Sequence, residues 1–172
     1  MAKTDVDSRY TGLGVLGALI ILYGHAQSYP QVYYIFGSFS LLLTAIHYKL
    51  VYFIALELIL AAGHSAILLG VGPYTQSALP VLLCFQLLIF YLMVGKDNSI
   101  FLLIGVVGIA LLSLGFAYNN QWIFFSGSLF VAIYAYYSGY KEYYASYIWA
   151  VLNTVFAVLA LYQLFLINMS KI

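Results

Sequence analysis

Long apolar segments separated by short polar connections run along nearly the whole chain. A helix that crosses a membrane needs about 20 apolar residues. By that measure the pattern predicts seven helices, at residues 10–27, 31–47, 50–71, 77–95, 99–118, 121–140 and 143–167. The prolines fall at or near predicted helix starts or in a connection, where a missing N–H does little harm: Pro30, Pro73 and Pro80. We therefore expect an all-α polytopic membrane protein that forms one transmembrane domain over residues 1–172.

The second half of the chain repeats the polar and small residues of the first half. A shift of 90 to 92 positions aligns the following residues: Gly37-Ser38 with Gly127-Ser128, Gln31 with Gln121, and Lys49 with Lys141. The fourth helix, 77–95, is then an inversion linker that makes a first three-helix repeat (10–71) parallel to a second (99–167). Many carriers hold their substrate near mid-membrane between such repeats. The alternative is chance recurrence of small residues that let helices pack closely.

Close packing is also the interpretation of a set of spaced glycines on the first and fifth helices. These are Gly14, Gly17, Gly105 and Gly108. Small residues at such spacing allow neighbouring backbones to approach.

The composition decides which solvent covers most of the surface. Hydrophobic residues make up 65% of the 172 residues and charged residues only 6%, with a mean hydropathy of +1.01. So few charges cannot cover a water-soluble domain, which points to lipid as the main solvent. The formal charge of +1 supplies no basic patch for phosphates, so nucleic acid is not an expected partner. A single cysteine, Cys84, excludes an intramolecular disulfide and a Cys-based metal site.

The basic residues predict how the chain is oriented. Five of the six fall on the N-terminal side of the predicted helices and one on the other side: Lys3, Arg9, Lys49, Lys96 and Lys141 against Lys171. Cytoplasmic flanks carry the excess of Lys and Arg. We expect a multi-pass protein of a cell (inner) membrane with a cytoplasmic N-terminus and an outside C-terminus.

The third predicted helix carries two ionisable groups in an otherwise apolar run. Glu57, Ala61, His64 and Leu68 follow helical steps and share one face. At about 1.5 Å per residue from Lys49, Glu57 lies about 12 Å and His64 about 22 Å along the helix. Ionisable groups at such depth usually face a cavity or a partner. One interpretation is that this face lines a polar cavity, in which Glu57 is either ionised against a cationic substrate or protonated as a hydrogen-bond donor. The alternative is that Glu57 and His64 form a buried hydrogen-bonded pair that holds two helices together.

The repeat shift places Trp149 and Asn153 of the last helix where Glu57 and Ala61 stand in the third helix. A flat ring and an amide suit a flat heterocycle, which stacks on the indole and hydrogen-bonds the amide. The alternative is an interfacial tryptophan and a helix-joining asparagine. Further polar side chains in reach of a central site are Gln86, Ser38 and Tyr134, each equally able to bond a neighbouring helix.

The spacing of Lys141, Trp149 and Asn153 resembles the last helix of the nicotinamide riboside transporter family, PnuC. Glu57 and His64 occupy places similar to a glutamine and an asparagine of that family, and the three-one-three helix plan is shared with SWEET sugar carriers. Ser146 stands where the family's first paired tryptophan would fall, which leaves stacking to Trp149 and Tyr147. The resemblance implies facilitated diffusion of a vitamin-like heterocycle, without ATP hydrolysis or cofactor, with trapping by cytoplasmic phosphorylation. It also implies a homo-oligomer, as a trimer.

The sequence thus favours a transporter for a small, planar, cationic, vitamin-like or nucleoside substrate, and not an enzyme. A non-transporting subunit or scaffold of a larger membrane complex is the alternative. An intramembrane metal, haem or enzyme site would need three or four convergent ligands, whereas His25, His47 and His64 fall on separate predicted helices. A retinal protein is disfavoured because the last helix offers no lysine for a Schiff base.

Overall fold

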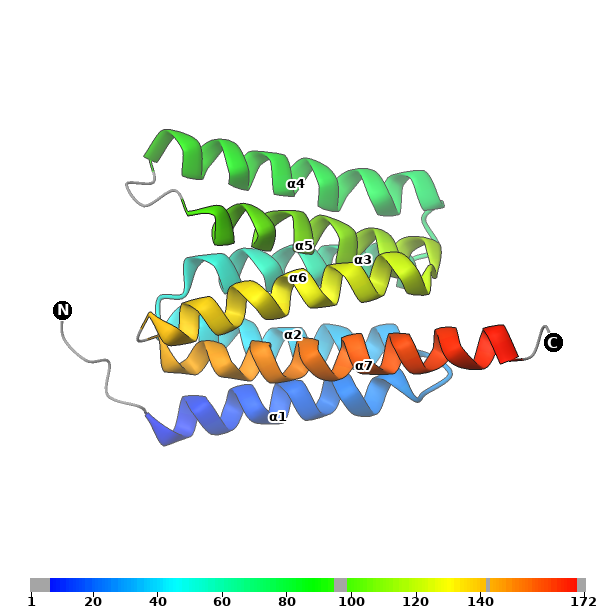
Figure 1. Cartoon of the computed structure of the whole chain (residues 1–172), viewed down its shortest axis with the longest axis horizontal. Coiled ribbons are helices and arrows are strands. Elements are labelled where there is room, and N and C mark those ends of the chain that lie inside the picture. Colours follow the sequence, from blue (N-terminus) through cyan, green and yellow to red (C-terminus); the bar gives the residue numbers. More distant parts are fainter. Residues whose placement is uncertain (1–6, 95–98, 142, 170–172) are drawn as a thin grey trace.

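The computed structural model describes residues 7–94, 99–141 and 143–169, and within these ranges the chain forms seven α-helices, one 3₁₀ helix and no strand. The helices are α1 (Ser8–His25), α2 (Pro30–His47), α3 (Val51–Leu68), α4 (Pro73–Val94), α5 (Ile100–Tyr118), α6 (Gln121–Tyr140), the 3₁₀ helix η1 (Tyr144–Ser146) and α7 (Tyr147–Met169). They lie side by side as one bundle (Figure 1). The expected all-α architecture and the seven helices are confirmed for the described residues.

The helix bounds agree with the sequence pattern except at two places. α4 begins at Pro73, four residues before the predicted start, so Pro80 lies inside the helix and not at its beginning. Proline is tolerated inside a helix when neighbouring groups compensate for the lost N–H bond, and Pro80 is buried beside Gly63 of α3. The last predicted helix begins instead as η1 and becomes α-helical at Tyr147.

Six of the helices contact one another in a closed order, which we call the six-helix ring. α1 packs on α2, α2 on α3, α3 on α5, α5 on α6, α6 on α7, and α7 returns to α1. α4 stands outside the ring at one edge of the bundle, against α3 and α5 (Figure 1). This order places α3 opposite α7. Residues on the inward faces of these two helices can therefore meet at the centre.

Glycines set the closest helix approaches, and they do so in matching places of the two halves. A Cβ on Gly37 of α2 would lie 2.3 Å from Ile21 of α1, and one on Gly127 of α6 would lie 2.3 Å from the backbone nitrogen of Leu112 of α5. Gly127 follows Gly37 by 90 positions, and Leu112 follows Ile21 by 91. The predicted packing role of Gly14, Gly17, Gly105 and Gly108 is confirmed, because each meets a neighbouring helix within 3.0 Å of an added Cβ.

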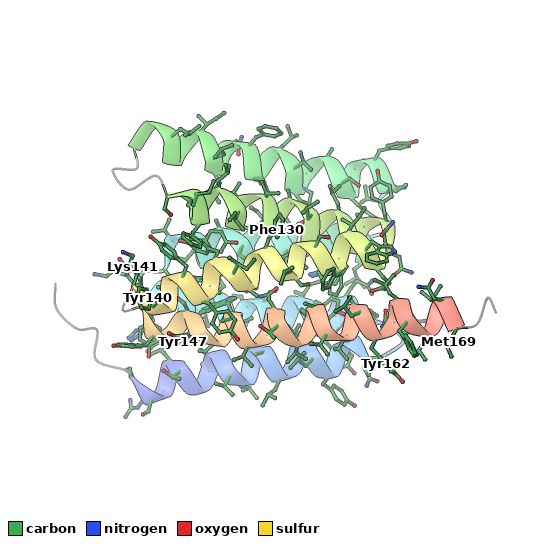
Figure 2. All side chains as sticks on the ribbon, in the orientation of Figure 1. Phe130, Tyr140, Lys141, Tyr147, Tyr162 and Met169 are labelled. Carbon is green, nitrogen blue, oxygen red and sulfur yellow. The ribbon has the colours of Figure 1, made fainter. Side chains whose placement is uncertain are left out.

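The outer surface is apolar over much of its area and the described charges gather at one end. Among the described residues, three segments are long and apolar enough to cross a membrane: Val51–Leu68, Ile100–Tyr118 and Tyr144–Met169. Arg9, Lys49 and Lys141 lie at the end where α1 begins, and Figure 2 shows Lys141 beside Tyr140 at that end, with Tyr162 and Met169 towards the other. Lys3, Lys96 and Lys171, which also entered the orientation argument, lie outside the described residues.

We predict that Gly127→Ala destabilises the bundle, because the added methyl meets the backbone of α5, which cannot rotate away. Overpacking of this kind costs about 1–3 kcal/mol. Gly63→Ala is the matched control, since its nearest neighbour would be Pro80 Cγ at 3.6 Å, an ordinary contact. Thermal unfolding in detergent checks the pair: equal melting temperatures for the two variants would contradict the packing role of Gly127.

Candidate functional site

A hydrogen bond joins the two faces that the sequence singles out, across the centre of the six-helix ring. Nε1–H of Trp149 on α7 donates to Oε1 of Glu57 on α3 at 2.7 Å, and both side chains are buried. This length is at the short end of the N–H···O range. Ser38 of α2 lies beside the same carboxyl group. The carboxyl group thus lies between three helices, with α3 and α7 facing each other as the repeat shift predicts.

Three polar atoms around this bond have no partner. Oε2 of Glu57, Oδ1 of Asn153 and Nδ1 of His64 are buried without a hydrogen bond. Nδ2 of Asn153 donates to the Trp149 carbonyl oxygen at 2.9 Å, which fixes the amide so that its oxygen stays free. Buried polar atoms almost always have partners, so each exception calls for an explanation. All three are acceptors when Glu57 is ionised and the proton of His64 sits on Nε2.

The three residues share a small cavity between the two halves of the chain, which we call the central cavity. Its lining residues are Ile21, Tyr34, Ser38, Leu56, Glu57, Leu60, His64, Leu112, Phe116, Leu152, Asn153 and Phe156. Several are repeat partners, among them Leu60 with Leu152 and His64 with Phe156, each pair 92 positions apart. The volume is about 20 Å³, which is room for roughly one water molecule. In this conformation the cavity is therefore closed around its polar atoms.

Trp149 has a different neighbour from the flat ligand expected for it. Its indole stacks on Phe53 of α3, with ring centroids 4.5 Å apart and planes inclined by 30°. The residue is fully buried and holds Glu57 in place without lining the central cavity. Stacking of a substrate on Trp149 stays a prediction.

Three other predicted site residues lie away from the central cavity. Gln86 is exposed on α4, which packs outside the ring, so its expected reach to a central site is corrected. Tyr134 of α6 packs against Tyr52 and Phe53. Tyr147 lies at the end where α1 begins, in a separate crevice of about 210 Å³ that Tyr48 and Tyr143 also line.

Two residues of the site were not anticipated. Phe53 stacks on Trp149, and Tyr34 packs on His64 with ring centroids 4.7 Å apart. Phe53 precedes Glu57 by four residues, and Tyr34 precedes Ser38 by four. Residues four apart share a helix face, so helical spacing from the polar residues contains the signal for both.

Comparison of the chain with protein-family models, with curated proteins and with solved structures finds no match. In the described part of the chain, no three His, Cys, Asp or Glu side chains come together as the ligands of a metal ion would. Glu57 and His64 remain two ionisable groups on one cavity, with Asn153 as their amide neighbour.

We predict that Trp149→Phe lowers the stability of the fold, because it keeps an aromatic ring on Phe53 but removes the indole N–H that donates to Oε1 of Glu57. Leaving a buried acceptor without its donor costs about 1–3 kcal/mol. Trp122→Phe is the matched control, since Trp122 is 61% exposed. Chemical or thermal unfolding of both variants measures the difference, and equal stability would show that the bond contributes nothing.

Proposed function

We propose that this chain is a multi-pass membrane transporter that carries a small, planar, cationic substrate of the vitamin or nucleoside class, such as nicotinamide riboside, by facilitated diffusion. All seven helices would cross the membrane, as two parallel three-helix repeats joined by α4. The N-terminus would be cytoplasmic and the C-terminus outside.

The observation that carries this proposal is the set of unpaired acceptors on the central cavity. Oε2 of Glu57, Oδ1 of Asn153 and Nδ1 of His64 are buried with no donor. An ionisable group at membrane depth costs roughly 2.5–3.5 kcal/mol on insertion scales, and such residues commonly mark substrate pathways. A cationic ring that bears an amide or amino N–H offers the missing charge and the missing donors together. The cavity is thus complementary to a cation and not to an anion.

The arrangement of the helices supports movement as well as binding. The central cavity lies between equivalent helices of the two halves, where carriers built from repeats hold their substrates. A space of about 20 Å³ cannot hold a nucleoside, so binding requires the halves to separate. This conformation then corresponds to a closed state without substrate, in equilibrium with open ones.

One observation favours the alternative of a non-transporting subunit in a larger membrane complex. The bond between Trp149 and Glu57 joins opposite helices through groups of the protein itself. A structural role of this kind accounts for Oε1 of Glu57. It leaves Oε2 of Glu57 and Oδ1 of Asn153 unexplained, and for this reason we prefer the transporter.

We predict that Glu57→Gln weakens the binding of nicotinamide riboside more than that of its neutral dihydro form. A hydrogen bond to a charged group contributes about 1.5–3 kcal/mol, which corresponds to a loss of roughly 10- to 150-fold for the cation. Trp149→Ala is expected to weaken both ligands, whereas Trp122→Ala, at an exposed site, weakens neither. Calorimetric titration of purified protein in detergent provides the affinities.

A thermal-shift screen against vitamins and nucleosides comes first, because a ligand of the folded state raises its apparent stability. Unchanged affinity in both Glu57→Gln and Trp149→Ala would refute the site. A protein that responds to none of these ligands but copurifies in fixed ratio with a partner would favour the subunit.

A further inference from the structure

A second and larger pocket opens at the end of the bundle where α1 ends and α6 begins. We call it the vestibule, and its polar residues are His25, Gln31, Tyr34, Asn119, Gln121 and Gln163. Its volume is about 580 Å³, within the range of small-molecule sites. None of the described residues that line it is Asp, Glu, Lys or Arg, and Oε1 of Gln121 is buried without a partner. The vestibule is therefore a neutral pocket equipped for hydrogen bonding.

A layer of six rings separates the vestibule from the central cavity, and each helix of the six-helix ring contributes one. We call it the aromatic layer, and its members are His25, Tyr34, His64, Phe116, Phe124 and Phe156. Tyr34 and Phe116 line both spaces, with ring centroids 5.3 Å apart. His64 packs against both of them. The two spaces are thus adjacent and kept apart by side chains alone.

The aromatic layer also follows the repeat, but its two halves differ in polarity. His25 pairs with Phe116 at a shift of 91, Tyr34 with Phe124 at 90, and His64 with Phe156 at 92. Every member from the first half carries a polar atom and every member from the second half is a phenylalanine. Nδ1 of His25 and the Tyr34 hydroxyl form a hydrogen bond of 2.8 Å, which holds these two residues together on the vestibule side.

We propose that the vestibule is an outer binding site for the uncharged, hydrogen-bonding part of a substrate, and that the aromatic layer is the gate between it and Glu57. This proposal rests on the proposed transport function. Side-chain amides and imidazoles both donate and accept hydrogen bonds, so they suit hydroxyl groups, such as those of a sugar, or a carboxamide. The central cavity holds the only described carboxylate of the two spaces and takes the cationic ring.

The polar half of the gate gives the substrate a continuous series of hydrogen-bonding partners. His25 and Tyr34 reach the vestibule, and Tyr34 and His64 reach the central cavity. The phenylalanines opposite them offer flat apolar surface to a planar ring. Opening requires rotation of Tyr34 or Phe116, and the bond between Tyr34 and His25 resists the first of these.

Access to the central cavity is measured by the reaction of introduced cysteines with a small water-soluble methanethiosulfonate, in a Cys84→Ser background. Ser38→Cys reports on the central cavity and Gln121→Cys on the vestibule. Ser128→Cys is the matched control, because Ser128 is the repeat partner of Ser38 and is equally buried but does not line the cavity. With the aromatic layer intact, only Gln121→Cys is expected to react quickly.

Shortening a ring of the gate should expose the central cavity alone. Tyr34→Ala or Phe116→Ala is expected to speed the modification of Ser38→Cys by about tenfold or more, in proportion to the open population, and to leave Gln121→Cys and Ser128→Cys unchanged. Tyr34 and Phe116 belong to different halves of the chain, so the two variants test the gate independently. Tyr34→Phe is a milder third variant, because it keeps the ring and loses only the bond to His25. It is expected to raise the modification rate of Ser38→Cys roughly fivefold. Equal rates at Ser38→Cys in all backgrounds would overturn the gate.

The class of ligand is tested at the vestibule reporter with two probes that share a cationic ring. Nicotinamide riboside has sugar hydroxyls, and 1-methylnicotinamide has none. The riboside is expected to slow the modification of Gln121→Cys more than the methylated compound does. Equal protection by both, or by neither, would overturn the vestibule as a site for uncharged groups. The cysteine experiments with the gate variants need no substrate. A chain that fails the Glu57 titrations can therefore still show a gate, so the gate and the proposed transport function are tested separately.

Discussion

The hydrogen bond between Trp149 and Glu57 is the constraint around which this bundle is arranged. In a low-dielectric interior a carboxyl group needs donors that bulk water cannot supply. The chain supplies one donor from the helix directly opposite, at 2.7 Å, so α3 and α7 must present these faces to each other. The remaining carboxyl oxygen has no donor. This bond thus joins the two halves at the centre and leaves one oxygen of the carboxyl group unpaired.

Close packing of the ring makes that meeting possible. Gly37 and Gly127 stand where any side chain would strike the neighbouring helix, so α1 with α2, and α5 with α6, form two tightly packed pairs in matching positions. Glycine also brings the two halves together, since a Cβ on Gly14 of α1 would lie 2.9 Å from Ile148 of α7. What distinguishes the contacts between the halves is that aromatic rings and polar atoms surround small cavities there. Rings can rotate, whereas backbones in contact through glycine cannot give way, so these rings are the adjustable part of the packing.

Much of this architecture follows from the sequence, because lipid imposes simple rules on helix length and on ionisable groups. The bounds of 121–140 match α6, and the face bearing Glu57 and His64 is buried at the centre. The start of α4 was placed too late because Pro80 resembles a helix start when contacts with α3 are unknown. Gln86 was expected inside because the sequence does not reveal that α4 stands outside the ring. The stacking of Phe53 on Trp149 depends on side-chain directions that only the packed structure defines.

The repeat is most informative where its two copies differ. At the centre, Glu57 and His64 of the first half face Trp149 and Phe156 of the second, and the aromatic layer divides in the same way. A symmetric site made of two carboxyl groups would place like charges together, which raises the energy of both. A cavity with polar atoms on one wall and rings on the other avoids that cost. Asn153 is the exception, because it places an amide on the ring-bearing wall where the first half has Ala61. Its unpaired oxygen gives that wall one hydrogen-bond acceptor. Divergence of the copies, more than their likeness, is what gives the central cavity two unlike walls.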